Sequence, residues 1–262
     1  MIILVSWELN LRHLIAVALL IGMIFSCTTN QSRAAEYQVY TYHNVPPFVT
    51  AVNTGLSYDL LRYLNQHGEG RYTFKLNIVP RKRLDALLKT NSDIIVPWAS
   101  PDWFGKDART KYAWTAPLMS DGNVYISQKQ SPIDVKGTND LQDLVLGGIL
   151  GHHYSNLDDE VALGRISRMN ARNERSLVRI VAGGRVDVGI IAESAARYLV
   201  WEEKLEGQIY FSADNHSVYV RRIMLSGYLP RVHTFLDKLI TQMSVDPEWL
   251  SIMSSYQLPP NS

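Results

Sequence analysis

Two segments in different halves of the chain repeat one local pattern, and this repeat constrains the fold more than any other feature. Residues 83–100 read RLDALLKTNSDIIVPWAS, and residues 176–194 read SLVRIVAGGRVDVGIIAES. Each segment has apolar residues at helical spacing, a polar or glycine turn, an aspartate and a continuous apolar run. This order is typical of a short helix followed by a strand that is covered on both faces. The repeat therefore predicts an α/β fold with crossover connections.

Strand and helix signals alternate along the rest of the chain as well. Residues 37–42 and 72–79 alternate between apolar and polar side chains, as half-buried strands do. Residues 55–67 place four leucines on one stripe of a helix. Two further helices, each starting at a proline, are expected near residues 230–243 and 247–256.

The repeat favours two similar lobes, each a mixed, mostly parallel sheet flanked by helices. We expect residues 36–127 to begin the first lobe, residues 128–215 to form the second, and residues 216–262 to return to the first. Residues 123–127 and 216–222 would be the strands that cross between the lobes. Because ligands bind beyond the carboxyl ends of the strands in open α/β sheets, the ends of the two repeated strands are expected to line one cleft.

The chain begins with a predicted signal peptide, residues 1–35, which indicates export to the periplasm. Two basic residues precede an apolar run, residues 14–25, that is too short to span a bilayer but fits a secretory signal. Two processing sites are possible. Residues 32–34 place small side chains at the positions that signal peptidase recognises. Alternatively, Cys27 follows a loose lipobox and would carry a lipid. Cys27 is the only cysteine, so we expect no internal disulfide.

Charge and motif spacing argue against several classes of partner. The formal net charge is +1, which gives no field for nucleic acid or an anionic membrane surface. His152 and His153 lie near acidic residues, but their spacing matches no recognised metal site. Gly183 and Gly184 fit a turn rather than a phosphate-binding loop. We therefore predict no metal, no cofactor and no nucleic-acid partner.

Seven motifs follow one another through most of the predicted mature chain. They are PPF (46–48), GLSYDLLRYLN (55–65), DIIVPWAS (93–100), YAWTAPL (112–118), NVYISQKQSPI (123–133), DLQDLVLGGILGHHYSN (140–156) and GGRVDVGIIAESAARYL (183–199). In this order the chain resembles family 3 of the bacterial extracellular solute-binding proteins, the periplasmic amino-acid-binding type. The resemblance implies two lobes joined by two crossing strands that close on a small polar solute, an amino acid or an amine. It also implies a monomer whose partner is an ABC-type transporter permease or a sensor protein.

The resemblance implies ligand contacts from the first lobe. Phe48 matches an aromatic residue that stacks on the ligand, and Trp98 and Ser100 match groups that follow the family's next buried strand. The family then uses an arginine to clamp the ligand's carboxylate. Arg109 is the only arginine near that place, displaced by an apparent insertion at residues 102–105.

The second lobe of the family contributes a glycine and two hydroxyl residues at the start of a helix, where this chain has Gly151 followed by His152, His153 and Tyr154. We expect these three side chains to hydrogen-bond the ligand in place of the hydroxyls. The family's acid for the ligand's amino group lies six residues beyond the aspartate of RVD, which leads to Glu193. An unpaired buried carboxylate is costly, so a cationic ligand group would explain Glu193; its alternative role is to favour the first turn of a helix.

Three classes of function remain open from the sequence. The favoured class is a solute receptor without catalytic activity. The second is an enzyme on the same scaffold, in which Glu193 and a neighbouring histidine would perform dehydratase-like acid–base chemistry. The third is a protein-interaction module with a degenerate pocket. Because no nucleophile motif, metal motif or lytic domain is visible, we predict a protein that is not an enzyme.

Overall fold

The computed structural model describes residues 34–90 and 93–259. The chain divides into two compact units, Met1–Ala34 and Ala35–Ser262, and the second unit contains all of the helices and strands given below. The apolar run at residues 14–25 and Cys27 lie outside the described residues, so the signal peptide and its processing site stay predictions. In the described part of the chain, no helix is both long and apolar enough to cross a membrane.

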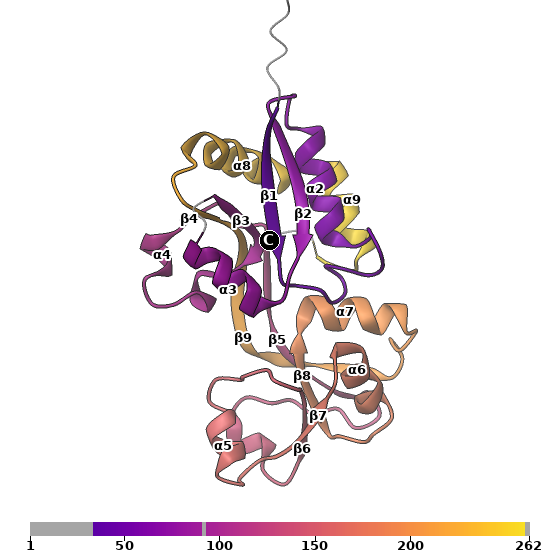
Figure 1. Ribbon diagram of the computed structural model, residues 1–262. Helices are drawn as coiled ribbons and strands as arrows, with labels where there is room; N and C mark the ends of the chain where they lie inside the picture. The colour runs from indigo at the N-terminus through magenta and orange to yellow at the C-terminus, as the bar shows by residue number, and fades with distance from the viewer. Residues whose placement is uncertain (1–33, 91–92, 260–262) are drawn as a thin grey trace, which may run out of the picture. The chain divides into compact units, whose positions relative to one another are not determined.

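The first lobe is built from both ends of the unit. Strand β1 pairs in parallel with β2 on one side and with β3 on the other. Two helices from the C-terminal end complete the lobe, and α9 lies against α2 (Figure 1). The elements of this lobe are β1 (Ala35–Thr41), α2 (Leu56–Gln66), β2 (Tyr72–Ile78), α3 (Arg81–Thr90), β3 (Ile94–Ala99), η1 (Pro101–Trp103), α4 (Ala108–Lys111), β4 (Ala113–Trp114), α8 (Pro230–Met243) and α9 (Pro247–Ser255).

The second lobe is continuous in sequence. Its central strand β6 pairs in parallel with β7 and with β8. The elements of this lobe are η2 (Thr138–Leu141), β6 (Val145–Ile149), α5 (Asp158–Ala162), β7 (Ser167–Ala171), α6 (Glu174–Ala182), β8 (Val188–Ala192) and α7 (Glu193–Glu202). The second copy of the sequence repeat corresponds to α6, β8 and the start of α7.

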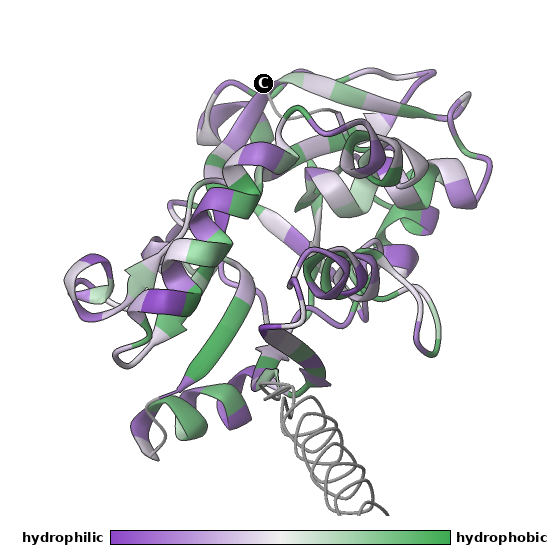
Figure 2. Cartoon of the chain, turned by 90° about the horizontal axis from the view of Figure 1, so that it is seen from above, coloured by the Kyte–Doolittle hydropathy of each residue, from purple (hydrophilic) through white to green (hydrophobic). Residues whose placement is uncertain are grey.

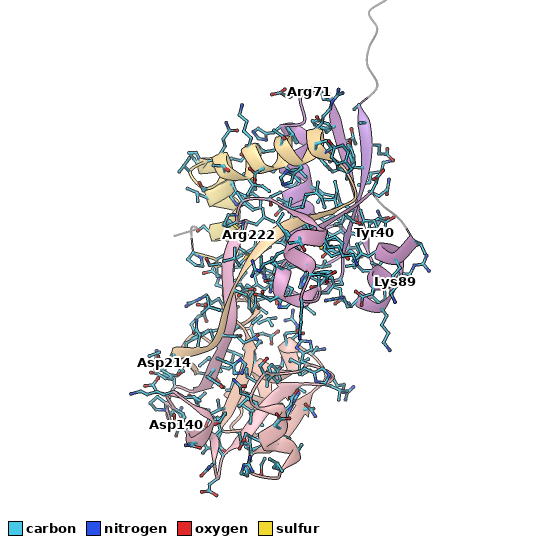
Figure 3. All side chains as sticks on the ribbon, turned by 90° about the vertical axis from the view of Figure 1, so that its left-hand side faces the viewer. Tyr40, Arg71, Lys89, Asp140, Asp214 and Arg222 are labelled. Atoms are coloured by element: carbon cyan, nitrogen blue, oxygen red, sulfur yellow. The ribbon has the colours of Figure 1, made fainter. Side chains whose placement is uncertain are left out.

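Two long antiparallel strands, β5 (Met119–Gln128) and β9 (Ile209–Ser226), connect the lobes. The strand order is β2-β1-β3-β9-β5-β8-β6-β7, so the pairing continues from one lobe into the other. Figure 3 shows Arg222 of β9 beside first-lobe elements, and Asp214 of the same strand near Asp140 of the second lobe. The predicted two-lobed α/β fold with two crossing strands is confirmed, and the expected lobe boundaries fall within β5 and β9.

Each lobe has its own hydrophobic core. In the first lobe, the leucine stripe of α2, including Leu56 and Leu60, is fully buried in one cluster with Leu236 of α8 and Trp249 of α9. In the second lobe, α6, α7 and β8 share a cluster with the crossing strands. The helices carry hydrophobic and hydrophilic residues on different sides (Figure 2), which is why the helical spacing in the sequence located them correctly.

Candidate functional site

A cavity of about 550 Å³ is lined by both lobes and by the crossing strands. Its lining residues are Tyr42, His43, Val45, Phe48, Arg81 and Trp103 of the first lobe, Asn123, Tyr219 and Arg221 of the crossing strands, and Ile149, Gly151, His152, His153, Tyr154, Glu174, Ile191, Ala192 and Ala195 of the second lobe. A neighbouring cavity of about 750 Å³ shares five of these residues, among them Trp103 and Tyr219. An occupant of the first cavity, which we call the interlobe cavity, would contact both lobes.

A buried ion pair supports the wall of the interlobe cavity. Nε of Arg221 donates to Oδ2 of Asp121 at 2.7 Å, and Nη1 donates to the carbonyl oxygen of Trp98 at 3.0 Å. The same aspartate accepts hydrogen bonds from the backbone N–H and the hydroxyl of Ser194, at the start of α7. Burial is the largest single effect and would lower the pKa of Arg221, but the charge and hydrogen bond of Asp121 together with Tyr219 and Tyr42 raise the pKa overall. Arg221 is therefore a charged side chain whose charge is already matched.

Aromatic rings surround the same guanidinium. The guanidinium carbon of Arg221 lies 4.7 Å from the ring centre of Phe48, and 5.2 Å from those of Trp103 and Tyr219. In such cation–π contacts the ring faces attract the guanidinium. Phe48 lines the cavity, as expected for a ligand-stacking residue, but one of its contacts is taken by Arg221. Stacking of Phe48 on a ligand stays a prediction.

A second arginine lies at the first-lobe side of the cavity. The guanidinium carbon of Arg81 lies 5.1 Å from the ring centre of Tyr42 and 4.4 Å from that of Phe104. Its Nε donates to Oδ1 of Asp85 at 2.8 Å, and its Nη2 donates to the carbonyl oxygen of Trp103 at 2.6 Å. Burial raises the pKa of Tyr42 to about 12, so its hydroxyl stays neutral. The charge of Arg81 thus also has a carboxylate partner.

Two of the three histidines that line the cavity are neutral near pH 7. Burial, reinforced by the positive charge of Arg221, lowers the pKa of His43 well below its usual value. Partial burial of the ring also lowers the pKa of His152, although the residue as a whole is exposed. The third, His153, is exposed, and its Nδ1 lies 3.0 Å from Oδ2 of Asp158. These rings therefore offer hydrogen-bonding nitrogens to the cavity rather than a block of positive charge.

Glu174 is the only carboxylate among the described residues that line the cavity. It begins α6, is 8% exposed, and stands after Asn173, whose side chain caps the helix by accepting from the N–H of Ser176. Its side chain makes no hydrogen bond or ion pair with the described part of the chain. Sequence reasoning missed Glu174, because an acid in the first turn of a helix is common and carries no motif.

Two of the predicted ligand residues lie in the protein interior instead. Trp98 is fully buried, and its indole N–H donates to the hydroxyl of Ser57 at 3.0 Å. Ser100 is 1% exposed and precedes η1. The sequence placed the end of the strand before Trp98, whereas β3 continues to Ala99 with an irregular register, and Trp98 has a φ of 63°. The structure does not bring either residue to the cavity wall.

Two predicted charged contacts also lie away from the cavity wall. Arg109 is exposed on α4, and its Nη2 donates to Oδ1 of Asp102 at 2.8 Å, within the insertion that the sequence indicated. Glu193 begins α7 and pairs with Arg197 one turn later, at 2.6 Å. The cavity is lined by its neighbour Ala192, but not by Glu193 itself. Ligand contact by these residues stays a prediction that this geometry does not favour.

The loop after β6 is brought to the cavity as expected. His152, His153 and Tyr154 all line it. Tyr154 is almost fully buried, and its hydroxyl accepts from the N–H of Ile149 at 3.1 Å and donates to the carbonyl oxygen of Ile190 at 3.3 Å. Tyr154 therefore anchors the loop. Across the described ranges, no group of three or more histidine, cysteine or acidic side chains could hold a metal ion.

Comparisons with known proteins identify the architecture. No family model and no curated protein sequence matches the chain. Solved structures do: an ancestral arginine-binding protein bound to arginine shares 16% identity, with a TM-score of 0.62 over 86% of this chain and 99% of that one. The unliganded, open L-cystine solute receptor of Neisseria gonorrhoeae shares 12% identity, with a TM-score of 0.64 over 88% of this chain and 96% of that one. The chain has a periplasmic-binding-protein fold.

The same fold occurs in a signalling protein. A histidine kinase sensor domain with similarity to periplasmic binding proteins shares 15% identity, with a TM-score of 0.64 over 87% of this chain and 99% of that one. At such identities the likeness concerns the fold. Within this periplasmic-binding-protein fold, the residues that line the cavity are particular to this chain, so its chemistry has to be argued from them.

Proposed function

We propose that this protein is a periplasmic receptor that captures a small polar solute, an amino acid or a related amine, between its lobes. The observation that carries the proposal is the interlobe cavity, which both lobes and both crossing strands line. Its volume of about 550 Å³ lies within the range of small-molecule sites, and its wall combines aromatic rings with a few polar groups. Solved amino-acid-binding proteins with the same fold support this proposal.

The mechanism that we propose is closure of the lobes about the crossing strands. A solute that contacts both lobes stabilises the arrangement in which both contacts are made, and so shifts the population toward it. Contacts from Phe48 in the first lobe and from His152, His153 and Tyr154 in the second would serve this purpose, since all four line the cavity. No bond needs to be made or broken, so the proposed role is binding rather than catalysis.

The partner that we propose is a membrane protein, either a transporter permease or a sensor. Solved structures with this fold include a solute receptor and a sensor domain, which supports both kinds of partner. A monomer in the periplasm suits either role, because the receptor must move between capture and delivery.

The test is a thermal-shift screen of the purified protein against amino acids, amines, sugar acids and short peptides. Native mass spectrometry comes first, and a co-purified solute is removed by unfolding and refolding. A solute at 100 times its Kd should stabilise the protein by about 2.7 kcal/mol, which is readily seen as a rise in Tm. Chemical conversion of a bound solute would instead indicate an enzyme. No response to any solute, together with co-purification of a membrane protein, would indicate an interaction module.

A further inference from the structure

Glu174 stands apart from the other charged groups of the interlobe cavity. The residue is 8% exposed and lines the cavity without a hydrogen bond or ion pair from the described residues. A largely buried carboxylate is normally paired or hydrogen-bonded, because burial removes part of its hydration. Neither carboxylate oxygen of Glu174 is fully sealed from solvent, so a group that enters the cavity can supply this partner.

The other charged groups at the cavity do not act as partners for the Glu174 carboxylate. Arg221 is paired with Asp121, and Arg81 is paired with Asp85. The ring of His152, which also lines the cavity, is neutral near pH 7 because burial lowers its pKa. The unmatched charge on the wall is thus a single negative one.

Helix geometry alone does not explain why Glu174 is buried. Both α6 and α7 begin with a glutamate, and an acid at this position is favoured by the helix dipole. Glu193 of α7 satisfies its charge with Arg197. Glu174 instead lies among the cavity-lining residues with Ile191 and Ala195, where apolar neighbours strengthen the attraction of any cation that enters.

We propose that Glu174 is the residue that binds the cationic group of the ligand, and that the site selects small organic cations such as primary amines and guanidines. The inference rests on the proposed function. It moves recognition of the cation from Glu193 to the start of α6. It also removes the need for a ligand carboxylate, because both arginines of the cavity are already paired.

The test compares three probes of similar size: phenethylamine, L-phenylalanine and 3-phenylpropionate. It adds agmatine and L-arginine as guanidinium probes, together with every solute that responds in the thermal-shift screen. Affinities are measured by calorimetry on the refolded, ligand-free protein. We expect the binders to carry a cationic group, amines to bind at least as well as the matching amino acids, and 3-phenylpropionate not to bind.

Substitutions of acidic residues test which carboxylate binds the cation. Glu174→Gln should weaken the affinity for the tightest-binding cation at least about tenfold, which is equivalent to about 1.4 kcal/mol of binding free energy. Glu174→Asp should retain part of the affinity. The control is Glu248→Gln, which neutralises an exposed acid in the first turn of α9, away from the cavity. It should leave the affinity unchanged. The Tm of each unliganded variant reports whether the fold is kept.

Each contrary result has its own meaning. If the best binder is an anion or a neutral solute, or if Glu174→Gln binds a cation as well as the natural chain, the inference fails while the receptor function stands. If Glu193→Gln is the variant that loses affinity, the cation is bound at the start of α7 and the inference also fails. If no solute of any charge binds, the receptor function fails and the inference fails with it.

Discussion

Oδ2 of Asp121 and Nε of Arg221 lie 2.7 Å apart, and the two side chains are 1% and 3% exposed. The pair joins the crossing strands β5 and β9, and it extends to the carbonyl of Trp98 in the first lobe and to Ser194 in the second. The residues that connect the lobes are thus held by charge as well as by strand pairing.

Removal of the Asp121 carboxylate should strongly destabilise the folded protein. In Asp121→Ala, the guanidinium of Arg221 stays buried without its counter-charge, so the free energy of unfolding should fall by about 3–5 kcal/mol. The double variant Asp121→Leu, Arg221→Met should recover much of this loss, because it leaves no unpaired charge. Urea denaturation of the three proteins measures both effects. A loss below about 1 kcal/mol in the single variant would contradict the assignment.

Trp98 should behave as a core residue. Its side chain is fully buried and hydrogen-bonded to Ser57, so Trp98→Ala should lower the free energy of unfolding by about 3–5 kcal/mol. Trp201→Ala is the control, because Trp201 is 44% exposed on α7, and its loss should cost less than about 1 kcal/mol. If both substitutions lower the free energy of unfolding by the same amount, Trp98 is not the buried core residue described above.

Glu193 should contribute little to stability. Its ion pair with Arg197 is a partly exposed pair one helical turn apart, which is worth about 0.3–0.5 kcal/mol, and the helix dipole adds a similar amount. Glu193→Gln should therefore lower the free energy of unfolding by less than about 1 kcal/mol. High salt should reduce the difference further. A larger loss in chemical denaturation would indicate a partner for Glu193 beyond Arg197.

Stability should fall as the pH is lowered below about 6.5. Burial lowers the pKa of His43 in the folded protein, whereas an unfolded histidine titrates near 6.5. Below that pH the unfolded chain binds a proton that the folded protein does not. His43 then lowers the free energy of unfolding by up to about 1.4 kcal/mol per pH unit.

Urea denaturation at pH 7.5, 6.5 and 5.5 measures this dependence. His43→Gln should show a shallower decline than the natural chain, because the buried titrating group is gone. Equal slopes for the two proteins would show that His43 takes up its proton without unfolding.

The first-lobe elements were predictable because their patterns are local. The leucine stripe of α2 corresponds to its buried face, and the alternation in β2 matches the burial of Phe74 and the exposure of Lys75, although Ile78 at the end of the strand is exposed. Strands β6 and β7 gave no such signal. In β6 a Cβ at Gly147 would lie 2.7 Å from Cδ1 of Leu177 in α6, so a side chain there would require Leu177 to shift, and no local pattern reveals this close packing.

The site was predictable only where loops follow a recognisable motif. Phe48 and the residues from His152 to Tyr154 reach the cavity in this way. Arg221 and Glu174 were missed because their burial depends on the pairing of β9 with β5 and on the packing of α6. Trp98 was misplaced because its positive φ turns the end of β3, which no pattern of residue types indicates.

The first lobe joins the two ends of the unit, and this has a consequence for how the chain acquires its structure. Leu60 of α2 shares one core with Leu236 and Trp249, which come almost at the end of the chain. The buried core of the second lobe comes from residues no later than Ile209, although Tyr256 also packs against it. During synthesis, part of the first-lobe core therefore stays uncovered until α8 and α9 have been made, whereas the elements of the second lobe are complete earlier.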